Sequence, residues 1–239
     1  MRIGLVPLQT HPNRPDINLQ HFMGVIQTLV AAQPLDLVIL PECALTGYVY
    51  RQDDLARFAE PVPGPTTEMM ANIARQFGIG ICFGLVEHSF AGIFNTAVLL
   101  GRDGEIQLTQ RKISEKPPYA AAHKLNVGQT EFGKIAILTC GDLFDERSAR
   151  QVPPDLDLLL TPMARGFDKK SPDPRRWENE ERQFYLEAVK QIGVTTAIVN
   201  ALDVGVTEGS FGGAMIVDGA GQILAESPHG TDLPLVYEL

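Results

Sequence analysis

The chain has 239 residues, of which 44% are hydrophobic and 21% charged, and its formal net charge is −9. This composition is typical of a globular protein with a substantial core. The acidic balance argues against a nucleic-acid partner, because phosphate binding requires clustered lysines and arginines. No stretch approaches the roughly 20 apolar residues of a membrane span, and the first apolar run is too short for a signal peptide. We therefore expect a cytoplasmic protein with no membrane partner, folded as a single domain over residues 1–239.

The first half of the chain alternates apolar runs with amphipathic segments. Its predicted elements are strands at 3–6, 37–40, 78–86, 95–100 and 105–109, and helices at 16–33 and 66–77. Pro41 ends the second strand, and the sequence Arg-Asp-Gly at 102–104 predicts a hairpin turn between the last two.

The second half repeats part of this pattern after a polar loop at 116–129. Its predicted elements are strands at 135–139, 157–160, 194–199, 212–217 and 223–225, a short helix from Asp142 and a long helix over 174–193. Both halves contain the same succession of elements: an apolar strand, a helix, and a second strand that begins with Asp and ends before Pro. This echo favours two similar α/β halves packed sheet against sheet, although apolar strands resemble one another in any case.

Three chemically useful side chains stand at the ends of apolar strands. Cys140 follows the strand at 135–139, Glu42 follows the strand at 37–40, and Lys112 ends the strand that begins at 105. Open α/β sheets place their sites at strand ends. A nucleophile, a base and a cation gathered there could attack an acyl carbon and stabilise the oxyanion that results.

Each of these residues also has an ordinary structural interpretation. A buried cysteine is often a small core residue, Glu42 could be a loop residue, and Lys112 a solvated edge lysine. Two features favour Cys140 as a nucleophile: Gly141 allows a sharp backbone turn, and a helix starting at Asp142 would make a nearby thiol more acidic. The other cysteines, Cys43 and Cys82, are assigned to packing, and three cysteines do not form a disulfide framework.

Together these segments resemble the nitrilase-like carbon–nitrogen hydrolase family. The matching stretches are residues 40–48 (LPECALTGY), 111–113 (RKI), 139–143 (TCGDL), 182–200 and 211–225. The resemblance implies an α/β fold, a four-layer α-β-β-α sandwich, assembled as a homodimer or higher homo-oligomer. It also implies Glu42 as base, Lys112 as oxyanion stabiliser and Cys140 as nucleophile. The backbone N–H of Gly141 is expected to be a second oxyanion donor.

The sequence departs from the family pattern in two places. Many relatives carry a second glutamate in the loop after the lysine, but that position falls near Ala121 here, and Glu115 and His123 are the candidates to replace it. The segment after Cys140 is closer to the glutamine-amidase branch associated with NAD synthetases. Arg165 follows a strand end; a surface arginine is the favoured interpretation, and a contact to a substrate carboxylate is the alternative.

The predicted activity is hydrolysis of a non-peptide C–N bond in a small amide or N-carbamoyl compound, through a cysteine thioester. A nitrile substrate is a variant of the same scheme. The alternative is a binding or regulatory member of the fold with weak or no catalysis, which the loss of the loop glutamate motivates. We expect no cofactor and no metal: the histidines are scattered, and the glycines at 78–84 lie inside an apolar strand with the wrong spacing for a dinucleotide loop.

Overall fold

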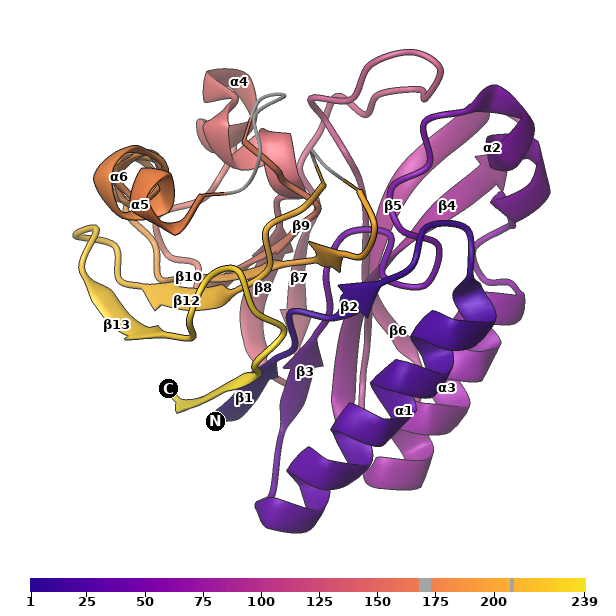
Figure 1. Ribbon diagram of the computed structural model, residues 1–239, viewed down its shortest axis with the longest axis horizontal. Coiled ribbons are helices and arrows are strands. Elements are labelled where there is room, and N and C mark those ends of the chain that lie inside the picture. The colour runs from indigo at the N-terminus through magenta and orange to yellow at the C-terminus, as the bar shows by residue number, and fades with distance from the viewer. Residues whose placement is uncertain (168–172, 207–208) are drawn as a thin grey trace.

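The computed structural model describes residues 1–167, 173–206 and 209–239. Two six-stranded sheets pack face to face, and helices cover their outer faces (Figure 1). Helices α1 (Pro15–Ala32) and α3 (Pro65–Phe77) lie side by side on one outer face, and the helices that follow β8 and β9 lie on the other. The predicted α-β-β-α sandwich is therefore confirmed.

The first sheet is built mainly from the N-terminal half. Strands β1 (Arg2–Leu5), β3 (Leu37–Ile39) and β4 (Gly80–Ser89) are parallel neighbours, and β5 (Gly92–Leu100) and β6 (Ile106–Arg111) continue the sheet antiparallel. The C-terminal strand β14 (Leu235–Glu238) closes the other edge antiparallel to β1. Both chain termini therefore lie in one sheet, as Figure 1 shows.

The second sheet has the same plan. Strands β8 (Gly133–Ile137), β9 (Leu158–Met163) and β10 (Thr196–Asn200) are parallel neighbours, followed by antiparallel β12 (Ala214–Val217) and β13 (Ile223–Glu226), while β7 (Val127–Thr130) closes the other edge antiparallel to β8. Each sheet thus has three parallel strands, two antiparallel strands on one side and one on the other. The sequence echo between the halves is confirmed at the level of topology, with β3 and β9 as equivalent strands.

The core lies between the sheets and beneath the helices. Alternate residues of the central strands meet between the sheets, and these are fully or almost fully buried: Ile3, Leu5, Leu37, Ile39, Ile135, Ile137, Leu158 and Leu160. The intervening residues, such as Val38, pack under the helices instead. Because both faces of these parallel strands are covered, the strands form continuous apolar runs, which is what makes them visible in the sequence.

Several short elements differ from the prediction. The expected helix over 174–193 is divided into α5 (Pro174–Arg176), a π-helical turn η2 (Trp177–Glu181) and α6 (Arg182–Ile192), which Gly193 ends in a left-handed conformation with φ of 77°. The loop predicted at 116–129 ends in β7. Short elements that the apolar pattern did not predict are β2 (Gln9–Thr10), β11 (Leu202–Asp203), α2 (Gln52–Phe58), α4 (Glu146–Ala149) and β14. Among the described residues, no helix is long and apolar enough to cross a membrane.

Candidate active site

Glu42 lies in the turn after β3, opposite the end of the equivalent strand β9. Its backbone N–H donates to the carbonyl of Met163 at 3.4 Å, and its Oε2 accepts a hydrogen bond of 3.0 Å from the Ala164 N–H. Its Oε1 accepts from Lys112 Nζ at 2.8 Å and from Asn95 Nδ2 at 2.6 Å. The side chain has no exposed surface, so these contacts fix the carboxylate between the two sheets.

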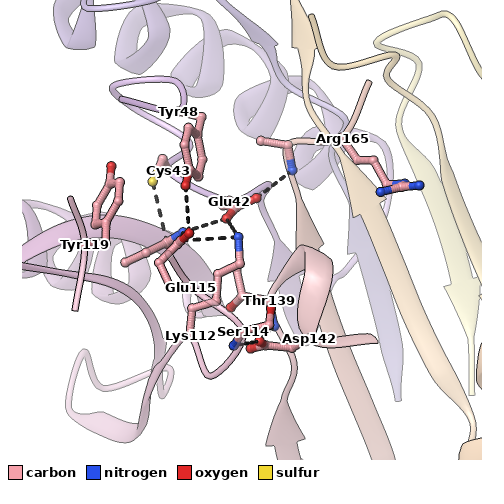
Figure 2. Close-up of polar contacts among 12 residues, drawn as sticks. Glu42, Cys43, Tyr48, Lys112, Ser114, Glu115, Tyr119, Thr139, Asp142 and Arg165 are labelled. Carbon is pink, nitrogen blue, oxygen red and sulfur yellow. Dashed lines mark hydrogen bonds and ion pairs between the residues drawn. The ribbon is translucent and has the colours of Figure 1, made fainter. Parts of the chain in front are cut away.

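Lys112 reaches the same position from the end of β6. Its side chain is only 8% exposed, so the interpretation as a solvated edge lysine is wrong. The ammonium pairs with Glu42 Oε1 at 2.8 Å and with Glu115 Oε2 at 3.3 Å (Figure 2). Burial lowers the pKa of Lys112, but the nearby anions outweigh it and raise the pKa above its ordinary value. The surrounding carboxylates therefore favour the charged form of Lys112 in this site.

Cys140 is the first residue of the 3₁₀ turn η1 (Cys140–Phe144), and it carries the backbone strain itself. Its φ is +50°, a left-handed conformation that is uncommon for residues with a side chain and is typical of functional sites. The expectation that Gly141 supplies the turn is corrected accordingly. Gly141 instead leaves room for Ser114, whose Oγ would lie 3.1 Å from a Cβ at that position.

The thiol of Cys140 lies close to the other two groups. The Ala164 N–H, which donates to Glu42, and the charges of Glu42 and Lys112 all act on the pKa of the Cys140 thiol. Burial, followed by the Glu42 charge, raises that pKa to about 12. The expected acidic thiol is therefore wrong: a turn of five residues does not offset the cost of burying a thiolate. Cys140 is 9% exposed, whereas Cys43 and Cys82 are 0% exposed.

Asp142 connects the Cys140 turn to the Lys112 strand. Its fully buried carboxylate accepts hydrogen bonds from the backbone N–H groups of Ile113 (3.0 Å), Ser114 (2.6 Å) and Thr139 (3.2 Å). Figure 2 shows this second group of contacts below the Glu42–Lys112 pair. This role of Asp142 was not predicted, although an acidic residue two positions after Cys140 is plain in the sequence.

Of the two candidates to replace the loop glutamate, the structure brings one into the site. Glu115 accepts hydrogen bonds from Asn95 Nδ2 at 2.9 Å and from the Tyr48 hydroxyl at 2.9 Å, in addition to its ion pair with Lys112. His123 is exposed, and its carbonyl accepts from the Gln151 side chain, so its candidacy is wrong. Asn95 and Tyr48 were not predicted, because a polar residue inside an apolar strand and a loop tyrosine have no chemical signature of their own.

Arg165 lies beside the site and is partly buried rather than fully exposed. Its side chain is 25% exposed, pairs with Glu181 at 3.6 Å and lies over the Phe144 ring. Asn200, at the end of β10, holds its backbone through two hydrogen bonds of 2.8 Å. The charge of Arg165 acts on the pKa of Cys140, but the Arg165 guanidinium points away from the Glu42–Lys112 pair (Figure 2).

The packing beneath the site is tight. Cys43, next to Glu42, also has a positive φ of 47°, and its sulfur lies 3.7 Å from Asn95 Oδ1. Gly84 of β4 makes room for this turn, because a Cβ there would lie 2.5 Å from the Cys43 nitrogen. In the part of the chain that the structure describes, no cluster of three or more His, Cys, Asp or Glu side chains could hold a metal ion.

The model of the carbon–nitrogen hydrolase family matches residues 2–237, and the chain belongs to that family. Omega-amidase NIT2 of Mus musculus is 26% identical over 253 residues, covering 99% of this chain and 87% of the relative. The carbon–nitrogen hydrolase from Helicobacter pylori G27 superposes with a TM-score of 0.83 at 18% identity, over 99% of this chain and 87% of the other. A Glu-to-Gln variant of the amidase from Nesterenkonia sp. AN1 superposes with a TM-score of 0.81 at 22% identity, over 100% and 93%.

Proposed function

We propose that this carbon–nitrogen hydrolase cleaves the C–N bond of a small amide, with Cys140 as nucleophile, Glu42 as general base and acid, and Lys112 as oxyanion stabiliser. The observation that carries the proposal is the buried ion pair of Glu42 and Lys112, 2.8 Å long, whose two charges both act on the Cys140 thiol. A base within reach of a nucleophile, with a fixed cation beside both, is the arrangement that acyl transfer requires.

The raised pKa of Cys140, about 12, sets the order of the first step. The resting group is a neutral thiol at neutral pH, so its proton must pass to Glu42 as the sulfur attacks the carbonyl carbon. The carbonyl oxygen becomes an oxyanion, which Lys112 and the Gly141 N–H stabilise. The C–N bond then breaks, and Glu42 returns the proton to the leaving ammonia.

The remaining thioester is then hydrolysed by water, with Glu42 and Lys112 in the same roles of general base and oxyanion stabiliser. Glu42 takes a proton from water, the resulting hydroxide attacks the thioester carbon, and Lys112 again faces the oxyanion. Breaking the C–S bond releases the carboxylic acid, and the thiol of Cys140 regains its proton. One amide and one water give one acid and one ammonia, so no oxidant or cofactor is needed.

The relatives support an amide as the substrate class. The mouse relative is an omega-amidase, and the Nesterenkonia structure carries acrylamide added to its active-site cysteine. N-carbamoyl compounds and nitriles would use the same nucleophile, and Arg165 is the candidate contact for a substrate carboxylate. A cytoplasmic location and assembly as a homodimer or larger homo-oligomer, over one domain of residues 1–239, belong to the same proposal.

The decisive experiment measures covalent chemistry at Cys140. The protein is incubated with glutamine, other terminal amides, an N-carbamoyl amino acid and a nitrile, quenched in acid and analysed by mass spectrometry, with ammonia release measured in parallel. We expect an acyl adduct on Cys140 and ammonia release from at least one amide, and neither from Cys140→Ala. Ligand binding with no adduct and no ammonia across the whole panel would instead favour a binding protein, and turnover by Cys140→Ala would refute the assignment.

A further inference from the structure

Glu115 belongs to the buried charge network although it follows Lys112 by only three residues. Its Oε2 lies 3.3 Å from Lys112 Nζ and accepts from Asn95 at 2.9 Å, while its Oε1 accepts from the Tyr48 hydroxyl at 2.9 Å. Its side chain is 6% exposed. A carboxylate buried to this extent is costly unless its charge is compensated, and Lys112 is the cation that compensates it.

Asn95 joins the two carboxylates into one unit. Its Nδ2 donates to Glu42 Oε1 at 2.6 Å and to Glu115 Oε2 at 2.9 Å, which uses both of its N–H groups. The Lys112 ammonium contacts the same two oxygens. The amide and the ammonium therefore bridge the same pair of anions, and Figure 2 shows these contacts converging around Glu115 and Lys112.

The geometry points to Glu115 as a positioning residue that orients the Lys112 ammonium for the oxyanion and keeps it charged during turnover. An ammonium has three N–H groups. Glu42 and Glu115 face two of its directions, so the remaining N–H is held for a substrate oxygen. This inference rests on the proposed function, since it concerns the oxyanion of that reaction.

The Glu115 carboxylate becomes important when the Glu42 carboxylate is neutralised. Once Glu42 has taken the thiol proton, it no longer provides a negative charge beside the buried lysine. The Glu115 carboxylate still lies 3.3 Å from Nζ and so favours the protonated form of Lys112 at the stage when the oxyanion forms. Ala121, near the place where many relatives carry a loop glutamate, has no carboxylate, and Glu115 supplies one from the segment of the lysine itself.

The test compares Glu115→Gln and Glu115→Asp with the wild type and with Glu105→Gln, which removes an exposed carboxylate from the β5–β6 turn. Turnover of the best amide is measured together with alkylation of Cys140 by chloroacetamide, which forms an S–C bond and releases chloride without an oxyanion. We expect Glu115→Gln to lower kcat by about 100-fold, the range of one lost oxyanion donor, with KM and the alkylation rate each changed less than threefold. Glu115→Asp should recover part of kcat, and the alkaline limb of kcat should move to lower pH in Glu115→Gln.

Two results would overturn the inference: unchanged kcat in Glu115→Gln, or an equal fall in kcat and in the alkylation rate, which would indicate general damage to the site. Glu105→Gln should behave as the wild type. A wrong assignment of the reaction can be distinguished from a wrong role for Glu115. The first would be seen in the wild type and in Cys140→Ala, and the second only in the Glu115 variants. If Cys140→Ala retains turnover, or if no amide is turned over, the reaction itself is misassigned and the inference falls with it.

Discussion

Asp142 accepts a hydrogen bond of 2.6 Å from the backbone N–H of Ser114, and this contact connects two segments that carry different parts of the site. One segment presents Lys112 from the first sheet, and the other presents Cys140 from the second. The Asp142 carboxylate is fully buried, and its contacts to backbone N–H groups on both segments set how far apart Lys112 and Cys140 lie.

Asp142→Asn should therefore weaken both the fold and the activity. The amide keeps the shape but has one acceptor oxygen, and its NH₂ group would face backbone donors. We expect the free energy of unfolding to fall by about 2 kcal/mol, the range for a lost hydrogen bond to a charged group, and kcat to fall at least tenfold. Urea unfolding and turnover check this, with the exposed Asp155→Asn as control. A variant with wild-type kcat would contradict the positioning role.

Lys112→Met should nearly abolish turnover and also destabilise the protein. Removing the ammonium takes away an oxyanion donor, worth about 100- to 1,000-fold in rate. It also leaves Glu42 and Glu115 buried without their cation, at a cost of about 3–5 kcal/mol in unfolding free energy. Lys134→Met, which breaks an exposed ion pair with Asp155, should change stability by less than about 0.5 kcal/mol. Equal stability of the two variants would argue against a buried charge network.

Alkylation should label Cys140 alone, and its rate should keep rising with pH. Cys43 and Cys82 have no exposed surface, whereas Cys140 has some. Because burial raises the pKa of Cys140 to about 12, the reactive thiolate increases about tenfold per pH unit between pH 7 and pH 10. Stopped-flow measurement with iodoacetamide and peptide mapping test both statements. A plateau below pH 9 would mean that the thiol is more acidic than its environment predicts.

Gly84→Ala should impair turnover, whereas Gly24→Ala should stabilise the protein. A Cβ at Gly84 would lie 2.5 Å from the Cys43 nitrogen and 3.1 Å from the Glu42 Cα, so the turn that carries the base must move. We expect kcat to fall by at least tenfold, because small displacements of catalytic groups are costly. A Cβ at Gly24, within α1, has no atom within 4 Å, and alanine there should stabilise the protein by about 0.5–1 kcal/mol. Thermal unfolding and turnover of both variants provide the comparison.

The amino-acid sequence by itself determined the sandwich, and it predicted three site residues at strand ends. Strands such as β3 and β9 are buried on both faces, so they are apolar throughout, and a single polar residue at the end of such a run is conspicuous. Cys140, Glu42 and Lys112 were predicted as site residues in this way. Short elements such as α2 and β14 were missed because a few half-buried residues carry little periodic signal.

Only the tertiary structure decided which polar groups complete the site and how acidic the thiol is. Glu115 and His123 had equal claims in the sequence, but the end of β6 directs Glu115 into the cluster and leaves His123 in solvent. Asn95 lies within an apolar strand, and its role depends on residues more than fifty positions away in one direction and twenty in the other. The pKa of Cys140 depends on its burial among side chains from distant segments such as Met163 and Tyr185, which local sequence does not encode, and this is why the expectation of an acidic thiol was wrong.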